Sequence, residues 1–413
     1  MAEQVDPHDP YAAVRSRNYR LFAAGFVCSS TGLQMLSAAV LWDVYVRTND
    51  ALAIGIVGLC RTLPVVLLAL PAGHVVDSAR RERVLVFTQI AMAGAAGLMA
   101  WANWSEQPLW VLYLLLVVTG CARSFNGPSR SALLPQLVEP ASFTNAVTWN
   151  SGLFQFAAIS GPIFAGLILA KSGVAWPVYL TTGVLCLVLA VFGSMLRPRP
   201  QEARAGGAMT FRSMTAGLKH VIAEKTVLAV ITLDLFAVLF GGATALIPIY
   251  AKDILHIGPF GYGVLKASPY VGALLMAVAI AHSPPMKKAG WTLLAAVAVF
   301  GLSTVGFGFS TIAWVSALML AIGGAADGIS VVIRHVLVQS RTPVELRGRV
   351  SAVNSVFIEC SNELGSFESG LVARYFGPVF SCVSGGIGTM LVVAGVAIAW
   401  PQVRRLGRLE NPK

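Results

Sequence analysis

The stretch Gly73-His-Val-Val-Asp77-Ser-Ala-Arg80-Arg81-Glu82-Arg83 is a short charged turn between two long apolar runs, at about 52–76 and 84–104. Each run is long enough for a helix to cross the hydrocarbon core of a bilayer, which takes about 20 residues. A charged turn between two such runs indicates two membrane helices that are joined on one side of the membrane. The same alternation of apolar runs and polar breaks continues in both directions from this stretch.

Twelve apolar runs, separated by charged residues or by Pro and Gly, are predicted to be membrane spans. They lie at about 19–44, 52–76, 84–104, 109–130, 144–170, 175–196, 227–250, 261–281, 290–310, 312–336, 350–373 and 379–400. The composition agrees, because 56% of the 413 residues are hydrophobic and only 12% are charged, against a usual charged share of about 25%. We therefore predict an all-α polytopic membrane protein with twelve transmembrane helices.

The basic residues predict the orientation of the chain. If the N-terminus is cytoplasmic, 22 of the 30 Lys and Arg residues fall at cytoplasmic ends and loops, four fall outside and four fall within spans. By the positive-inside rule, both termini are then expected in the cytoplasm. The basic residues are spread over loops instead of forming one face, so the net charge of +11 does not predict a nucleic-acid partner. Anionic lipid headgroups are the expected contact.

The longest polar stretch divides the spans into six and six. Its first part is typical of a flexible linker, and residues 211–222 have the spacing of an amphipathic helix on the membrane surface. The predicted organisation is a cytoplasmic tail (1–18), an N-terminal six-helix bundle (19–196), a cytoplasmic linker (197–225), a C-terminal six-helix bundle (226–400) and a cytoplasmic tail (401–413).

The two halves resemble each other in sequence. At an offset of 204 residues, Arg130-Ser-Ala-Leu aligns with Arg334-His-Val-Leu, and Asn150-Ser151 aligns with Asn354-Ser355. Internal duplication of a six-span unit is typical of secondary transporters, which hold substrate near the membrane midplane between the halves. We therefore predict two pseudo-symmetric bundles, with spans 1, 4, 7 and 10 around a central cavity.

The turn after the second span resembles the cytoplasmic signature of the major facilitator superfamily. Ser78, Arg80 and Glu82 depart from that signature. An acid at a helix end followed by a basic turn can form a salt bridge that depends on which side of the transporter is open. The residues that the resemblance assigns to such a conformational latch are Gly73, Asp77, Arg81 and Arg83.

Further motifs resemble the superfamily branch that contains the enterobactin exporter and macrolide efflux proteins. They lie at 126–135, 246–250 and 342–351. In the fifth span, Ala157-x-x-x-Gly161-Pro162-x-x-Ala165-Gly166 resembles the antiporter signature of drug:proton exchangers. The resemblance implies that Gly161, Pro162 and Gly166 let the fifth and eighth helices approach closely. Generic packing of small residues is the alternative.

Charged residues within the spans are the candidate site residues, because an ionised side chain at the bilayer centre costs at least about 2.5–3.5 kcal/mol and so faces a cavity or a partner. Two sets repeat at the offset of 204: Arg123 with Arg130, and Asp327 with Arg334. In each set the residues share one helical face. The pseudo-symmetry predicts that Arg123 faces Asp327 across the cavity, and that Arg130 and Arg334, nearer the cytoplasm, are gate or structural charges.

The carboxylates are candidates for proton coupling. Asp327 is the first choice, because a carboxylate holds a proton more tightly in a poorly hydrated cavity and less tightly beside an arginine; a static Arg–Asp pair is the alternative. Glu359 and Glu363 are i, i+4 neighbours that cannot both ionise cheaply. One is expected to stay protonated or to pair with Arg334 or Lys266, unless the two belong to a hydrogen-bonded network that braces the helix.

Two further charges interrupt apolar spans. Asp234 in the seventh span could contact substrate or pair with a cation. Arg61 in the second span could balance an acid or attract an anionic substrate.

Other function classes lack their motifs. The sequence has no Walker A loop, HExxH or nucleophile elbow, and its six cysteines lie in apolar runs, where they are expected to be small buried hydrophobes. The prediction is a monomeric transporter without metal or cofactor in the bacterial inner membrane. Its expected partners are protons, lipids and a small-molecule substrate.

The branch resemblance implies proton-coupled export, by alternating access, of a small amphipathic molecule such as a siderophore-like metabolite or a drug. The alternatives are a flippase or importer of an amphipathic lipid such as a lysophospholipid, which a lateral opening between helices would indicate, and, at lower weight, an intramembrane enzyme.

Overall fold

A computed structural model describes residues 9–199, 218–283, 286, 288–343 and 346–407. Most of the predicted linker and of the predicted surface helix at 211–222 lies outside the described residues. The described part of that predicted helix, 218–222, is helical. The predicted C-terminal tail is described as far as residue 407.

Within the part of the chain that the structure describes, twelve helical segments cross the molecule, six in each half. Those of the N-terminal half are α2 (Arg17–Thr48), α3 (Ala51–Ser78), α4 (Arg81–Trp104), α5 (Leu109–Leu137), α6 (Phe143–Ser172) and α7 (Trp176–Ser194). Those of the C-terminal half are α9 (Lys225–Phe240, continued by η2, Gly242–Ala245, α10, Ile247–Ile249, and η3, Tyr250–Ile254), α11 (Gly258–Ala281), α12 (Ala289–Phe309), α13 (Ala313–Arg341), α14 (Arg347–Phe376) and α15 (Pro378–Ala399). Short helices are α1 (Ala12–Arg15), η1 (Pro140–Ser142) and α16 (Pro401–Arg404).

One of the twelve segments is unusually polar. Within the described residues, eleven helical segments are long and apolar enough to cross a membrane, and α14 is not among them. It carries acidic side chains at Glu359, Glu363 and Glu368. Since α14 packs against α3, α9 and α15, protein and cavity surround much of its surface, which makes such residues tolerable inside a membrane protein. The twelve-helix arrangement predicted from the sequence is present.

The internal repeat is visible in the helix boundaries. Helices α5 and α13 are both 29 residues long, and α6 and α14 are both 30 residues long. Each pair is offset by 204 residues, since 313 − 109 and 347 − 143 give the same difference. The register found in the sequence is therefore the register of the structural repeat.

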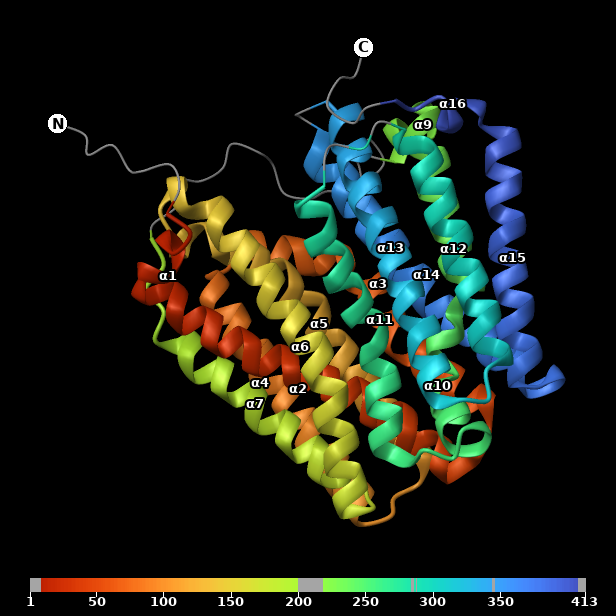
Figure 1. Cartoon of the computed structure of the whole chain (residues 1–413). Coiled ribbons are helices and arrows are strands. Elements are labelled where there is room, and N and C mark those ends of the chain that lie inside the picture. The colour runs from red at the N-terminus through yellow and green to blue at the C-terminus, as the bar shows by residue number, and fades with distance from the viewer. Residues whose placement is uncertain (1–8, 200–217, 284–285, 287, 344–345, 408–413) are drawn as a thin grey trace.

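The two bundles meet along two pairs of helices, α6 with α11 and α3 with α14. In Figure 1 the bundles converge at one end of the molecule and diverge at the other, where α1 and α16 lie. We call the end that carries α1 and α16 the terminal end, and the end that carries the turns at 49–50 and 255–257 the distal end.

The apolar core shows which end is closed. At the distal end one continuous cluster contains buried residues of both bundles, including Met35 and Tyr45 of α2, Tyr250 of η3 and Tyr262 of α11. At the terminal end, buried residues fall into separate clusters, one in the N-terminal bundle and two in the C-terminal bundle. Among the described residues, the bundles thus share a buried apolar core at the distal end and not at the terminal end.

Candidate functional site

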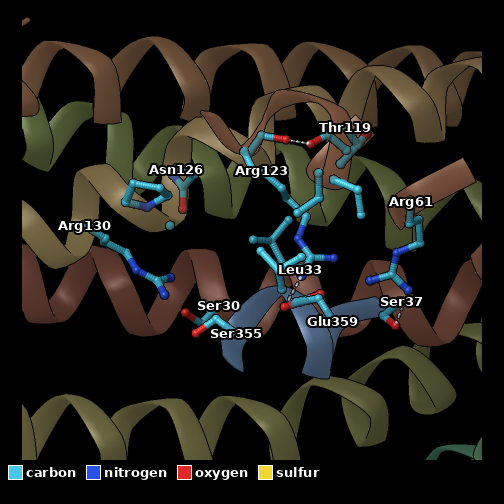
Figure 2. Close-up of a pocket in the computed structure, with 18 of the residues that line it drawn as sticks. Ser30, Leu33, Ser37, Arg61, Thr119, Arg123, Asn126, Arg130, Ser355 and Glu359 are labelled. Atoms are coloured by element: carbon cyan, nitrogen blue, oxygen red, sulfur yellow. Dashed lines mark hydrogen bonds and ion pairs between the residues drawn. The ribbon is translucent and has the colours of Figure 1, made fainter. Parts of the chain in front are cut away.

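The central cavity lies between the bundles and has a volume of about 690 Å³. It is lined by α2, α3, α5, α6 and α14 and extends from Arg61 and Glu359 at mid-depth to Arg130 and Gly348 nearer the terminal end. Figure 2 shows side chains of these helices pointing into it. The volume falls within the range of small-molecule sites. The helices from spans 7 and 10, α9 and α13, are not among those that line it, so the expected four-helix lining is wrong in part.

The cavity wall is amphipathic. Its apolar part includes Leu33, Val40, Val65, Leu116 and Phe154. Its polar part consists of hydroxyl, amide and charged side chains. They are Ser30, Gln34, Ser37, Arg61, Thr119, Arg123, Ser124, Asn126, Arg130, Ser131, Ser351, Ser355 and Glu359. Such a surface suits a small molecule that has both an apolar body and polar groups.

Three arginines and one glutamate provide the charges of the wall. Arg123 on α5 faces Glu359 on α14, with 4.0 Å between Nη2 and Oε1 (Figure 2). Arg61 on α3 donates a hydrogen bond from Nη1 to Ser37 Oγ at 3.1 Å. The guanidinium of Arg130 lies over the ring of Phe26, with 4.6 Å from Cζ to the ring centroid. A cation–π contact of this kind stabilises a cation without neutralising it.

A second group of charges surrounds this centre. Arg61 interacts electrostatically with Glu363 as well as with Arg123 and Glu359. Lys266 on α11 interacts with Arg61 and Glu363, and its Nζ donates to the carbonyl of Thr244. The centre of the molecule is therefore a network of cations and carboxylates from α3, α5, α11 and α14.

The structure corrects the predicted pairing of Arg123 with Asp327. Asp327 lines a second, smaller cavity of about 200 Å³ within the C-terminal half, together with Tyr270 and Asn362. The partner of Arg123 is Glu359. The repeat places Arg123 on α5 and Asp327 on α13 at equivalent positions of their helices. The helix that faces α5 across the cavity, however, is α14 and not α13. Tyr270 lies within electrostatic reach of both Asp327 and Arg61, so the smaller cavity adjoins the central network.

Asp234 and Arg334 form a buried ion pair between α9 and α13. Both side chains are less than a tenth exposed, at 9% and 4%. Asp234 was expected either to contact substrate or to pair with a cation, and in the structure it pairs with a cation. Arg334 is correspondingly occupied within the C-terminal half, and the expected pairing of Glu359 or Glu363 with Arg334 is replaced by the contact of Glu359 with Arg123.

The predicted latch lies at the terminal end, between α3 and α4. Arg81 donates from Nη1 to the carbonyl of Ala132 on α5 at 3.0 Å, Gly73 is buried and Arg83 is exposed. Among the departures from the superfamily signature, Arg80 and Glu82 pair with each other at 2.7 Å. The side chain of Asp77 lies outside the described residues, so its place in a latch stays a prediction.

Gly166 on α6 and Gly263 on α11 bring these two helices into close contact, whereas Gly161 faces α2 and not, as the resemblance had implied, α11. A Cβ atom on Gly166 would lie 2.6 Å from the carbonyl oxygen of Pro259 and 3.1 Å from Cα of Gly263. A Cβ on Gly161 would lie 2.9 Å from the carbonyl oxygen of Thr31 on α2, and Pro162 contributes its carbonyl to the contact with Gly263. An antiporter role for these residues stays a prediction.

Polar contacts between the bundles close the distal end, and no pattern in the sequence indicates which residues pair. The hydroxyl of Tyr45 donates a hydrogen bond to the carboxylate of Asp253. Lys252 donates a hydrogen bond to Asn49 Oδ1 at 2.6 Å. Arg374 on α14 pairs with Asp50 at 2.7 Å. We call these three contacts the distal seal. Taken singly, the residues resemble ordinary polar residues at span ends.

We expect Arg374→Gln to weaken the distal seal and to raise the population open at the distal end. An exposed ion pair contributes about 0.2–1 kcal/mol, so the expected rise is about fivefold at most. The measurement is labelling of Ser37→Cys, in a cysteine-free background, by an impermeant thiol reagent applied from the distal side. The matched control is Arg199→Gln, which breaks an exposed pair with Glu139 at the terminal end. Equal labelling rates in both variants would contradict the expectation.

Taken together, two six-helix bundles, a central amphipathic cavity and a closed distal end define an integral membrane transporter of the major facilitator fold. The chain belongs to the transmembrane secretion effector family of that superfamily, whose model matches residues 8–408. This confirms the resemblance found in the sequence and places the chain with transporters instead of enzymes.

Named relatives are exporters. The chain is 26% identical over 404 residues to the multidrug efflux pump Tap of Mycolicibacterium fortuitum, covering 95% of this chain and 97% of that protein. It is 24% identical over 397 residues to the enterobactin exporter EntS of Escherichia coli O127:H6, covering 93% and 92%. These matches support export of small molecules by a secondary transporter.

Solved structures share the fold at low sequence identity. A bacterial homologue of the human lysosomal transporter Spinster, in an inward-facing and occupied conformation, has a TM-score of 0.72 at 14% identity and covers 96% of this chain and 99% of that one. The nucleoside transporter NupG has a TM-score of 0.69 at 13% identity, covering 96% and 100%.

Proposed function

We propose that the protein exports a small amphipathic molecule from the cytoplasm of a bacterium by alternating access, driven by protons that move in the opposite direction. The observation that carries the proposal is the central cavity, which is bounded by both bundles and closed at the distal end by a shared core and the distal seal. Rocking of the bundles about their two contact pairs would close the terminal end and open the distal end.

The orientation follows from the charges. The terminal end carries the short loops rich in Arg and Lys, including those at 79–83 and 404–405. By the positive-inside rule, these charges support the proposal that the terminal end faces the cytoplasm. In this orientation the cavity receives its substrate from the cytoplasm, which is the direction expected of an exporter in the inner membrane. The relatives' names suggest a siderophore such as enterobactin, or a drug, as cargo.

Asp327 is the proposed proton carrier. It lines a cavity of its own beside the central one, and within the described residues no basic side chain forms an ion pair with it. An acid that adjoins the substrate cavity without lining it can gain and lose a proton while substrate is bound. Tyr270, which interacts electrostatically with Asp327, Arg61 and Glu363, would connect the proton site to the charges of the central cavity.

We expect Asp327→Asn to abolish uphill export and to preserve downhill exchange, because an amide cannot carry a proton. The measurement uses proteoliposomes with an imposed pH gradient, loaded with enterobactin or a panel of amphipathic drugs, and compares net accumulation with exchange at equal concentrations. The control is Glu139→Gln, which removes an exposed carboxylate at the terminal end. Export that ignores the pH gradient in the wild type, or that survives unchanged in Asp327→Asn, would contradict proton coupling at this residue.

A further inference from the structure

The charges that line the central cavity do not cancel. Three arginines, Arg61, Arg123 and Arg130, stand against one acid, Glu359, which gives the wall a net formal charge of +2. The adjacent Lys266 and Glu363 balance each other, so including them leaves this excess unchanged. A cation excess in a cavity of low dielectric attracts anions and repels cations more strongly than the same charges do in water.

Among the described residues, no carboxylate pairs with Arg130. Its guanidinium lies over the ring of Phe26. The electrostatic neighbour that it does have is another cation, Arg123. A guanidinium presents up to five donors in a fork that suits carboxylate, sulfonate or phosphate groups. Arg130 therefore offers donors to an anion that enters from the terminal end.

Arg123 is paired, but loosely. Its distance of 4.0 Å from Glu359 is at the limit for an ion pair and beyond hydrogen-bond length. The Glu359 side chain is 47% exposed, and that of Arg123 is 32% exposed, although both lie at mid-depth in the fold. Their exposed atoms face the cavity (Figure 2). A ligand anion can displace Glu359 from Arg123 without uncovering a buried charge.

The two arginines are seven residues apart on α5, which is about 10 Å along a helix axis. The same cavity wall carries apolar side chains, among them Leu33, Leu116 and Phe154. An elongated ligand with an aromatic or aliphatic body and an acidic group near each end would contact both guanidinium groups and the apolar wall at once.

We propose that the cargo is an amphipathic organic anion, that Arg123 and Arg130 bind its acidic groups, and that Glu359 competes with the ligand for Arg123. The inference deepens the proposed function, because it names the substrate class of the same cavity. It also gives Glu359 a role distinct from that of Asp327: Glu359 holds Arg123 when the cavity is empty and yields it when the anion enters.

The test is calorimetric binding to the purified protein in nanodiscs, with four probes on one carbon skeleton. They are biphenyl-4-sulfonate, biphenyl-4,4′-disulfonate, the neutral biphenyl-4-sulfonamide and the cationic 4-biphenyl-trimethylammonium. We expect the monosulfonate to bind about tenfold tighter than the neutral and cationic probes, and the disulfonate tighter again, because hydrogen bonds between charged groups are about twice as strong as neutral ones.

Variants separate the roles. Arg130→Gln should bring the disulfonate down to the affinity of the monosulfonate, Arg123→Gln should weaken both, and Glu359→Gln should strengthen both by about fivefold. The neutral probe should not respond. Lys171→Gln, which removes an exposed cation at the distal end of α6, should change nothing. Equal binding of the neutral and anionic probes to the wild type would overturn the inference, as would equal losses in Arg123→Gln and Lys171→Gln.

The wild-type probe series needs no variant, so a misfolded substitution cannot leave the inference undecided. Its failure is also distinct from failure of the proposed function. If the protein binds anions selectively but its export is not driven by protons, the proposed anion site stands and the proposed proton coupling is refuted. If protons drive export of neutral or cationic compounds and the protein shows no selectivity for anions, the proposed proton coupling stands and the proposed anion site is refuted.

Discussion

Arg334→Gln is expected to destabilise the protein by about 3–5 kcal/mol, because it leaves the Asp234 carboxylate buried without its partner. Both side chains are nearly inaccessible, and the pair joins α9 to α13 in the C-terminal bundle. The measurement is thermal unfolding in detergent, followed by intrinsic tryptophan fluorescence and by the monodisperse fraction after heating. The expected result is a melting temperature far below that of the wild type.

Two controls make this prediction specific. The double variant Asp234→Asn with Arg334→Gln removes both charges, so it should recover most of the lost stability. Arg374→Gln breaks an exposed pair with Asp50 and should cost about 0–1 kcal/mol. A stability of Arg334→Gln equal to that of Arg374→Gln would show that Asp234 is free to serve another role, such as contact with substrate.

Gly166→Val is expected to reduce transport by tenfold or more without unfolding the protein. The new side chain would begin 2.6 Å from the carbonyl oxygen of Pro259, where α6 meets α11. Overpacking of a close helix contact costs about 1–3 kcal/mol. The strain falls on the conformation in which these helices touch, so it shifts the balance between conformations, and about 1.4 kcal/mol corresponds to a tenfold change in population.

The matched control is Gly152→Val on the same helix, because a Cβ atom at Gly152 meets nothing within 4 Å. Both variants add the same volume and the same β-branched side chain to α6. We expect downhill export to stay near the wild-type rate in Gly152→Val and to fall only in Gly166→Val. Equal rates in the two variants would mean that close packing of α6 and α11 has no part in the transport cycle.

Much of the fold was predictable because its causes are local. Apolar length determines each span, and the charged turn at 73–83 separates two of them without any information from distant residues. The repeat offset of 204 residues, found from short matches around Arg130 and Arg334, is the offset of complete helices in the structure. The polar helix α14 was also predicted as a span, at about 350–373.

The partners of the site residues were less predictable because they depend on how the helices tilt. The repeat gives Arg123 and Asp327 equivalent depths, but tilting of the bundles brings Glu359 to Arg123 and leaves Asp327 in a separate cavity. Residues separated by more than 200 positions form the contact of Tyr45 with Asp253. Nothing in either local sequence distinguishes such a pair from two interfacial residues of separate helices.

The most direct test of alternating access is a pair of distance measurements between spin labels in nanodiscs. One pair of labels, at Arg83 and His282, spans the terminal end between the bundles; the other, at Glu106 and Thr311, spans the distal end. All four positions are exposed. We predict that changing the pH or adding biphenyl-4-sulfonate shortens the terminal distance and lengthens the distal distance together. Distances that stay fixed, or that change in the same direction at both ends, would contradict the account.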